Sequence, residues 1–126
     1  MNVLDNLQYS KSHEWVEKLD NGNVRIGLTD YAQSELGDLV FVNLPEEDDD
    51  IAVGEAFADV ESVKAVSDVF SPVSGKVAAI NEELLDAPEK INEDPYGAWF
   101  VEISDVTEEE ELLDSAAYEK LCEEEN

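Results

Sequence analysis

Short apolar segments limit what this chain can fold into. No apolar run among the 126 residues is longer than four, and several segments alternate apolar and polar residues, which is the period of a half-buried β-strand. Residues 24–28 alternate in this way after Asn21-Gly22, a pair that favours a tight hairpin turn because both residues tolerate positive φ. Residues 39–44, with five apolar positions of six, predict a strand covered on both faces. The pattern therefore predicts a small, mostly β sandwich or barrel with peripheral helices.

The length and composition fit one domain, which we expect to span residues 1–126. With 43% apolar residues the chain can bury a core without disulfides. Its one cysteine, Cys122, cannot form an internal disulfide and fits a reducing compartment. No apolar run approaches the roughly 20 residues of a membrane span, and the N-terminus lacks a basic head or a signal-peptide stretch. We expect a cytoplasmic monomer without a membrane partner.

Two other segments have sequence patterns that predict helices. Thr29-Asp30 offers an N-cap, residues 30–36 provide one or two turns, and Gly37 can end the helix. Near the other terminus, Thr107 to Glu110 match a capping box, and the residues that follow are apolar at helical spacing as far as Leu121. We therefore predict a short helix in the N-terminal half and a C-terminal helix over about 107–124.

The charge is strongly acidic. Thirty-three aspartates and glutamates against seven lysines and arginines give a net charge of −26. Nucleic acid and anionic lipid are disfavoured as partners, because both require clustered basic residues. Two interpretations remain: a mimic of nucleic acid, or adaptation to high salt. We favour salt adaptation, because the carboxylates are spread over nearly every segment and a mimic would concentrate them.

Few residues could form a catalytic or metal site. His13 is the only histidine, with no cysteine or second histidine near it, so its ordinary role is a structural polar residue at a strand start. The run Glu46 to Asp50 lacks the alternating spacing and central glycine of a calcium-binding loop. Signatures of phosphate loops, serine hydrolases and zinc proteases are also absent from the sequence. We expect no metal site and no enzymatic activity.

Lys64 is the residue that stands out. It lies between two alternating segments, one up to Val60 and one from Val69, and glycines at 54 and 75 flank the unit almost evenly. This arrangement predicts a hairpin over about 54–75 with the lysine at an exposed tip. Most surface lysines are merely solvated. An acylated lysine at a tip can instead act as a long, flexible arm that carries a reagent between sites.

Four motifs resemble the H proteins of the glycine cleavage system: SHEW at 12–15, ESVKA at 61–65, SPVSGKV at 71–77 and PYGAWFVEI at 95–103. The resemblance implies the hybrid barrel-sandwich fold of lipoyl and biotinyl domains, with lipoate attached to Lys64 in amide linkage. It also implies that the protein shuttles an aminomethyl group from a pyridoxal-phosphate glycine decarboxylase to a tetrahydrofolate-dependent aminomethyltransferase. A dihydrolipoyl dehydrogenase and a lipoate ligase or lipoyltransferase complete the implied partners.

The same resemblance implies a cleft that shelters the loaded arm. Ser12, Glu14 and Asp68 match the family positions that line it, with Glu14 pairing with the amine and the other two adding hydrogen bonds. Judged on composition alone, Glu14 and Asp68 would be ordinary members of an acidic surface. The sequence departs from the family pattern at the acidic run 46–50 and at residues 98–100.

Three other functions fit less well. A biotinyl domain places methionines beside its lysine, whereas Val63 and Ala65 stand here. A lipoyl domain of an oxoacid dehydrogenase usually has an aspartate before the lysine, and it lacks both the SHEW hairpin and an acidic C-terminal helix. An acidic inhibitor or mimic would leave Lys64 unmodified and interchangeable.

The charge predicts that stability rises with salt. The Debye length falls from about 30 Å at 0.01 M to about 3 Å at 1 M, which removes the mutual repulsion of exposed carboxylates. The melting temperature should therefore rise across this range in potassium chloride. A melting temperature that stays flat or falls would argue against salt adaptation and for the mimic.

Overall fold

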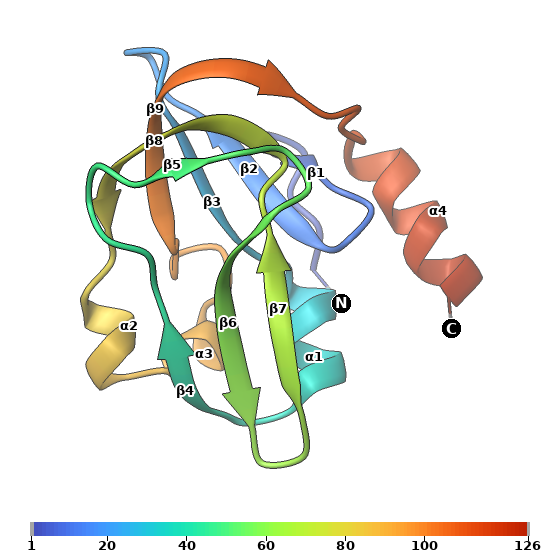
Figure 1. The fold of residues 1–126 in the computed structure, drawn as a ribbon. Coiled ribbons are helices and arrows are strands. Elements are labelled where there is room, and N and C mark those ends of the chain that lie inside the picture. The colour runs from blue at the N-terminus through green and yellow to red at the C-terminus, as the bar shows by residue number, and fades with distance from the viewer. Residues whose placement is uncertain (1, 126) are drawn as a thin grey trace.

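The computed structural model describes residues 2–125, so the two end residues of the predicted domain lie outside it. Strands dominate this part of the chain (Figure 1). In chain order the elements are β1 (Gln8–Tyr9), β2 (Glu14–Lys18), β3 (Val24–Leu28), α1 (Asp30–Leu36), β4 (Leu39–Asn43), β5 (Asp50–Ile51), β6 (Ala56–Ser62), β7 (Val66–Phe70), β8 (Val73–Ile80), α2 (Glu83–Asp86), α3 (Lys90–Glu93), β9 (Val101–Glu109) and α4 (Ser115–Glu125).

Within residues 2–125 the strands form two antiparallel sheets. One has six strands in the order β1-β2-β3-β9-β8-β5, and the other has three in the order β4-β6-β7. Figure 1 shows the smaller sheet in front of the larger one, with α1 beside β7 and α4 at the right of the view. Apolar residues from both sheets, such as Ile26, Val60, Val69 and Ile103, are buried in one core cluster. The predicted mostly β class, with antiparallel strands and few helices, is confirmed.

The local turn and helix signals of the N-terminal half are also confirmed. β2 and β3 pair over their whole length, and Gly22 in the turn between them has a φ of 89°. The Thr29 side chain caps α1 by accepting a hydrogen bond from Ala32 N at 3.1 Å. Gly37, with a φ of 83°, ends this helix. Because only glycine adopts such a conformation without strain, the chain can turn sharply into β4 at this point.

The C-terminal helix begins later in the chain than the predicted range of about 107–124, so the predicted start is wrong. Thr107 to Glu109 lie in β9, where Glu108 pairs with Ser74 and Glu109 with Val73. The helix itself starts at Ser115, and Asp114 Oδ1 accepts a hydrogen bond from Ala117 N at 2.8 Å. The capping-box pattern at Thr107 is overridden because pairing with β8 satisfies the same backbone groups through a longer ladder.

The strand at residues 39–44 is not covered on both faces, so that prediction is wrong. In β4, Leu39 and Val42 are buried, but the side chains of Val40 and Phe41 are 56% and 48% exposed. The register shifts between Leu39 and Phe41, so that the strand contains one extra residue opposite β6. Such a β-bulge interrupts the period of two, and it turns Phe41 to the outer face.

None of the helices within residues 2–125 is long and apolar enough to span a membrane.

Candidate functional site

Lys64 lies at the exposed tip of the hairpin formed by β6 and β7. The backbone of Ser62 donates to Ala65 O at 2.7 Å, which closes the turn. The Ser62 hydroxyl oxygen in addition accepts hydrogen bonds from Lys64 N (3.2 Å) and Ala65 N (3.0 Å). Sequence reasoning did not single out Ser62, although a serine two residues before a turn centre is a known signal for this side-chain cap. The result is a hydrogen-bonded turn that presents one lysine to solvent.

The tip is tied to the end of α1. Val63 N donates to Asp38 O at 3.2 Å, which holds the turn against the segment between α1 and β4. A Cβ atom added at Gly37 would lie 3.4 Å from Lys64 Cε, so the lysine stem passes over this glycine. The lysine therefore emerges at the C-terminal end of α1, and α1 is one wall of the nearby cleft.

A cleft of about 380 Å³ lies between α1, β7 and the turn before β2. Ser12, Glu14 and Asp68, named from the sequence, all contribute to its lining. Other parts of the wall come from α1, which includes Tyr31 and Glu35, and from Glu125 at the end of α4. Lys64 itself is not part of this lining. The fold thus brings residues about 55 positions apart in sequence to one acidic cleft.

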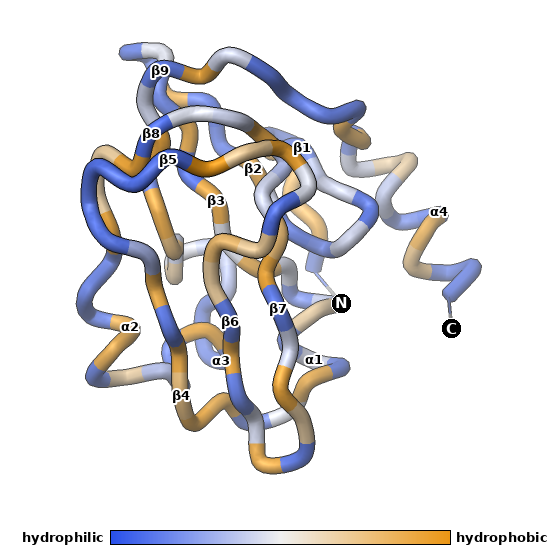
Figure 2. Tube along the Cα trace, viewed as in Figure 1, coloured by the Kyte–Doolittle hydropathy of each residue, from blue (hydrophilic) through white to orange (hydrophobic). Residues whose placement is uncertain are grey.

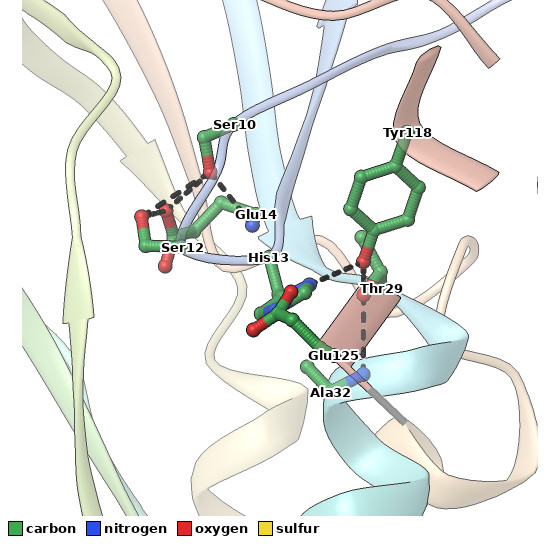
Figure 3. Close-up of polar contacts among 8 residues, drawn as sticks. All are labelled: Ser10, Ser12, His13, Glu14, Thr29, Ala32, Tyr118 and Glu125. Carbon is green, nitrogen blue, oxygen red and sulfur yellow. Dashed lines mark hydrogen bonds and ion pairs between the residues drawn. The ribbon is translucent and has the colours of Figure 1, made fainter. Parts of the chain in front are cut away.

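Glu14 is the most constrained carboxylate of the cleft. Its side chain is only 1% exposed, and Oε1 accepts hydrogen bonds from the hydroxyls of Ser10 (2.6 Å) and Ser12 (2.5 Å). Oε2 accepts a long hydrogen bond from Phe70 N at 3.4 Å. Figure 3 shows the two serines converging on this carboxylate. Burial raises the pKa of Glu14 to about 7, although the two hydroxyls and the Phe70 N–H act in the opposite direction.

Ser10 is a site residue that sequence reasoning missed. It is fully buried, its hydroxyl also accepts a hydrogen bond from Glu14 N at 2.9 Å, and its backbone N–H donates to Glu14 O. The signal in the sequence was weak, namely a second serine two residues before Ser12. Ser10 therefore fixes both the backbone and the carboxylate of Glu14.

Asp68 has a different environment. It lies on β7 opposite Asp59, and its side chain is exposed. An exposed carboxylate keeps its hydration and can add charge to the cleft without a large cost of burial. The cleft therefore combines one buried carboxyl group with exposed ones at its edge.

His13 connects this cleft to α4. Its Nδ1 lies 2.7 Å from the Tyr118 hydroxyl, and its Nε2 lies 2.9 Å from Glu125 Oε2. The Tyr118 hydroxyl also lies 2.7 Å from Thr29 Oγ1, the capping atom of α1 (Figure 3). His13 thus has the structural role expected of a lone histidine. Within residues 2–125 no group of three histidine, cysteine or acidic side chains is arranged to hold a metal ion.

The comparisons with known proteins agree with one another. The family model described as glycine cleavage H-protein matches residues 7–125. The chain is 62% identical over 125 residues to a glycine cleavage system H protein of Lachnoclostridium phytofermentans, covering 99% of this chain and 98% of the relative. It is 54% identical over 121 residues to a probable glycine cleavage system H protein of Pyrococcus horikoshii, covering 96% and 90%. A crystal structure of such a protein from Mycobacterium marinum superposes with a TM-score of 0.88 at 38% identity, covering 94% and 97%.

The burial of Glu14 predicts a pH-dependent effect on stability. Its pKa is about 7 in the folded state and 4.5 in a solvated chain, so the ionised carboxyl destabilises the fold as pH rises through this window. Above pH 7 the destabilisation amounts to about 3 kcal/mol. Glu14→Gln stays neutral and should gain stability relative to the wild type as pH rises from about 4.5 to about 7.

Urea unfolding of both proteins between pH 5 and pH 8 measures this difference. Glu35→Gln is the matched control, because Glu35 lines the same cleft but is exposed. Its effect on stability should be small, because an exposed carboxylate keeps its hydration. A constant difference between Glu14→Gln and the wild type at every pH would contradict the assigned role of burial.

Proposed function

The chain belongs to the glycine cleavage H-protein family, and from this premise we propose that Lys64 carries lipoate in amide linkage. The family is the lipoyl-carrying shuttle of the glycine cleavage system, so the protein is a carrier component and not itself a catalyst. The observation that supports Lys64 is its position on a closed hairpin tip beside an acid-lined cleft.

The residues present fit the cofactor. Acylation requires an accessible, free amine, and none of the ion pairs found within residues 2–125 includes Lys64. Lipoate supplies a dithiolane at the end of a long chain, whose sulfur takes up and releases the aminomethyl group of glycine. The Ser62 turn holds the attachment point still, and Gly37 leaves room for the lysine stem beside α1. The arm can therefore be directed along α1, which also lines the cleft.

We assign the cleft residues to sheltering the load. An amine is cationic near neutral pH, and a carboxylate favours the cation most strongly where little water screens the pair. Glu14 meets this condition because it is buried, and a cation beside it would favour its ionised form. Ser12 and Asp68 add hydrogen-bonding groups at the cleft surface. In this proposal the cleft keeps water away from a labile load during transit between enzymes.

The partners follow from the shuttle function. We propose that the protein accepts its load from a pyridoxal-phosphate glycine decarboxylase and delivers it to a tetrahydrofolate-dependent aminomethyltransferase. A dihydrolipoyl dehydrogenase would reoxidise the arm, and a lipoate ligase or lipoyltransferase would attach it. The family places the protein in the glycine cleavage system, which supports this set.

The proposal includes a monomeric carrier domain over residues 1–126 in the cytoplasm. Support for a reducing compartment comes from Cys122, which is buried and free. We also propose that the acidic surface reflects adaptation to salt. Most acidic side chains are exposed, and the ion pairs found within residues 2–125 involve only four of them.

The attachment site is tested by Lys64→Arg, which keeps the charge but removes the acceptor amine. We expect intact-mass analysis of protein from a lipoate-competent host to show no lipoyl group on this variant. Lys76→Arg changes another exposed lysine, on β8, and should remain fully lipoylated. Lipoate found on the Lys64→Arg variant would refute the assignment.

The shelter is tested by Glu14→Gln in loaded protein. A charge-assisted hydrogen bond contributes roughly 1.5–3 kcal/mol, so loss of the carboxylate should speed spontaneous release by about ten-fold or more. Ammonia release over time, measured with both partner enzymes removed, gives this rate. Glu35→Gln removes the same charge from an exposed position of the cleft and should have a much smaller effect. Equal rates for wild type and Glu14→Gln would mean that Glu14 does not hold the load.

A further inference from the structure

Large apolar side chains are exposed around the hairpin tip. Val63 and Val66 flank Lys64 and are 74% and 68% exposed. Val40 and Phe41 on the neighbouring β4 are 56% and 48% exposed. We call these four residues the tip face. Among the residues that the structure describes, only Phe70 and Leu85 are further exposed apolar side chains of this size.

The strand register places Phe41 and Val66 of the tip face on one side of the smaller sheet. Phe41 pairs with Glu61, and Glu61 pairs with Val66, so the three lie in one row across β4, β6 and β7. Val42, Val60 and Ser67 form the adjacent row, and both valines are buried on the inner face. Since neighbouring rows alternate between faces, the first row lies on the outer face. Figure 2 shows hydrophobic segments along β4 and on both sides of the tip.

The bulge in β4 is what exposes Phe41. With an unbroken period of two, Leu39 and Phe41 would both face the core, whereas the extra residue at Val40 turns Phe41 outward. The outward turn exposes an aromatic side chain at the edge of a sheet, where an apolar surface promotes unwanted association. A surface of this kind is characteristic of a place where another molecule binds.

The negative charge around the tip face indicates which kind of partner can bind there. Asp38, Asp59 and Glu61 lie beside it, and the whole chain has a net charge of −26. A second copy of this chain would bring like charges together, which opposes association. An apolar pocket surrounded by lysines or arginines would complement both features of the tip face.

The short length of the unmodified Lys64 side chain indicates which enzyme this partner is. Before lipoylation the amine ends a four-carbon stem, so an enzyme that acylates it must bring its active site onto the tip itself. Enzymes that act on the far end of the attached arm can stay at a distance from the tip. The acylating enzyme can therefore contact the surface next to Lys64 during its reaction.

We propose that the tip face is the docking surface for the lipoate-attaching enzyme, through an apolar pocket with a basic rim. This inference rests on Lys64 as the attachment site, and it adds the surface by which that lysine is recognised. Phe41 and Val66 supply the apolar contacts on either side of Glu61. These two residues act on binding of the protein substrate and not on the chemistry of the amine.

The test is acylation of the unmodified protein by a purified lipoate ligase with lipoate and ATP, followed by intact mass. The variant Phe41→Thr with Val66→Thr keeps strand-favouring residues at exposed positions. Loss of two apolar contacts should raise the KM for the protein about ten-fold with little change in kcat. Leu85→Gln on α2 is the matched control, because Leu85 is 49% exposed, close to the 48% of Phe41. It should be acylated like the wild type.

Two further measurements make the result decisive. The rate at which a small acylating reagent modifies Lys64 should be the same in the double variant and the wild type, which shows that the amine is equally accessible. Equal melting temperatures of the two proteins show that the fold is intact. The KM of the wild type should also rise with potassium chloride, because the basic rim is screened. Wild-type KM values for the double variant would overturn the docking surface while leaving Lys64 as the attachment site.

The remaining outcomes are equally clear. A double variant that is acylated normally but unloaded slowly by the aminomethyltransferase would assign the tip face to that enzyme and refute this proposal. Acylation of the Lys64→Arg variant would refute the attachment site, whatever the tip face does.

Discussion

One hydroxyl group, that of Tyr118, connects α4 to two walls of the cleft, namely α1 and the turn before β2. It lies 2.7 Å from His13 in the turn that carries Ser12 and Glu14, and 2.7 Å from Thr29, which caps α1. The Tyr118 ring stacks on Tyr9 with centroids 4.5 Å apart, in a cluster separate from the main core. Each buried hydrogen bond contributes only about 1 kcal/mol net, but leaving such a group unsatisfied costs more. The position of α4 therefore depends on the same contacts that hold two walls of the cleft.

The cleft is distinguished by the burial of one carboxyl group and not by the number of its carboxylates. The chain has 33 acidic residues, and nearly all of them can be hydrated at the surface. Glu14 is the exception, because Ser10 and Ser12 replace part of its water and the surrounding turn excludes the rest. Its pKa of about 7 means that its charge responds to a nearby cation at neutral pH. The proposal that the cleft shelters a load therefore depends on Glu14 and not on the exposed carboxylates around it.

Hydrogen bonds close the hairpin tip that carries Lys64. Ser62 closes the turn, and Val63 is held by Asp38, so the backbone at Lys64 has few degrees of freedom. Flexibility then resides in the side chain and in whatever is attached to it, whose range is set by the fixed attachment point. The apolar side chains beside Lys64 and the bulge in β4 lie on the same rigid unit. The two proposals, attachment at Lys64 and docking on the tip face, therefore concern the same small sheet.

The sequence by itself determined the features that depend on near neighbours. Asn21-Gly22 predicted the β2–β3 turn, Thr29 and Gly37 predicted the limits of α1, and the alternation around Lys64 predicted the exposed hairpin. The candidate cleft residues came from a family resemblance that the comparisons confirm over residues 7–125, and the fold places all three in one cleft. Their roles toward a loaded arm remain predictions.

Only the tertiary structure decided the features that depend on distant partners. Thr107 to Glu109 became strand and not helix because β8 offers a ladder of hydrogen bonds, and a local capping pattern cannot report that ladder. The bulge that exposes Phe41 arises from pairing with β6. The five apolar residues among the six of residues 39–44 therefore led to the wrong prediction of a strand buried on both faces. The burial of Glu14, and the role of Ser10 in it, required the turn to pack beneath β7. Desolvation and strand pairing depend on which residues meet in space, whereas turn and cap signals act within a few residues along the chain.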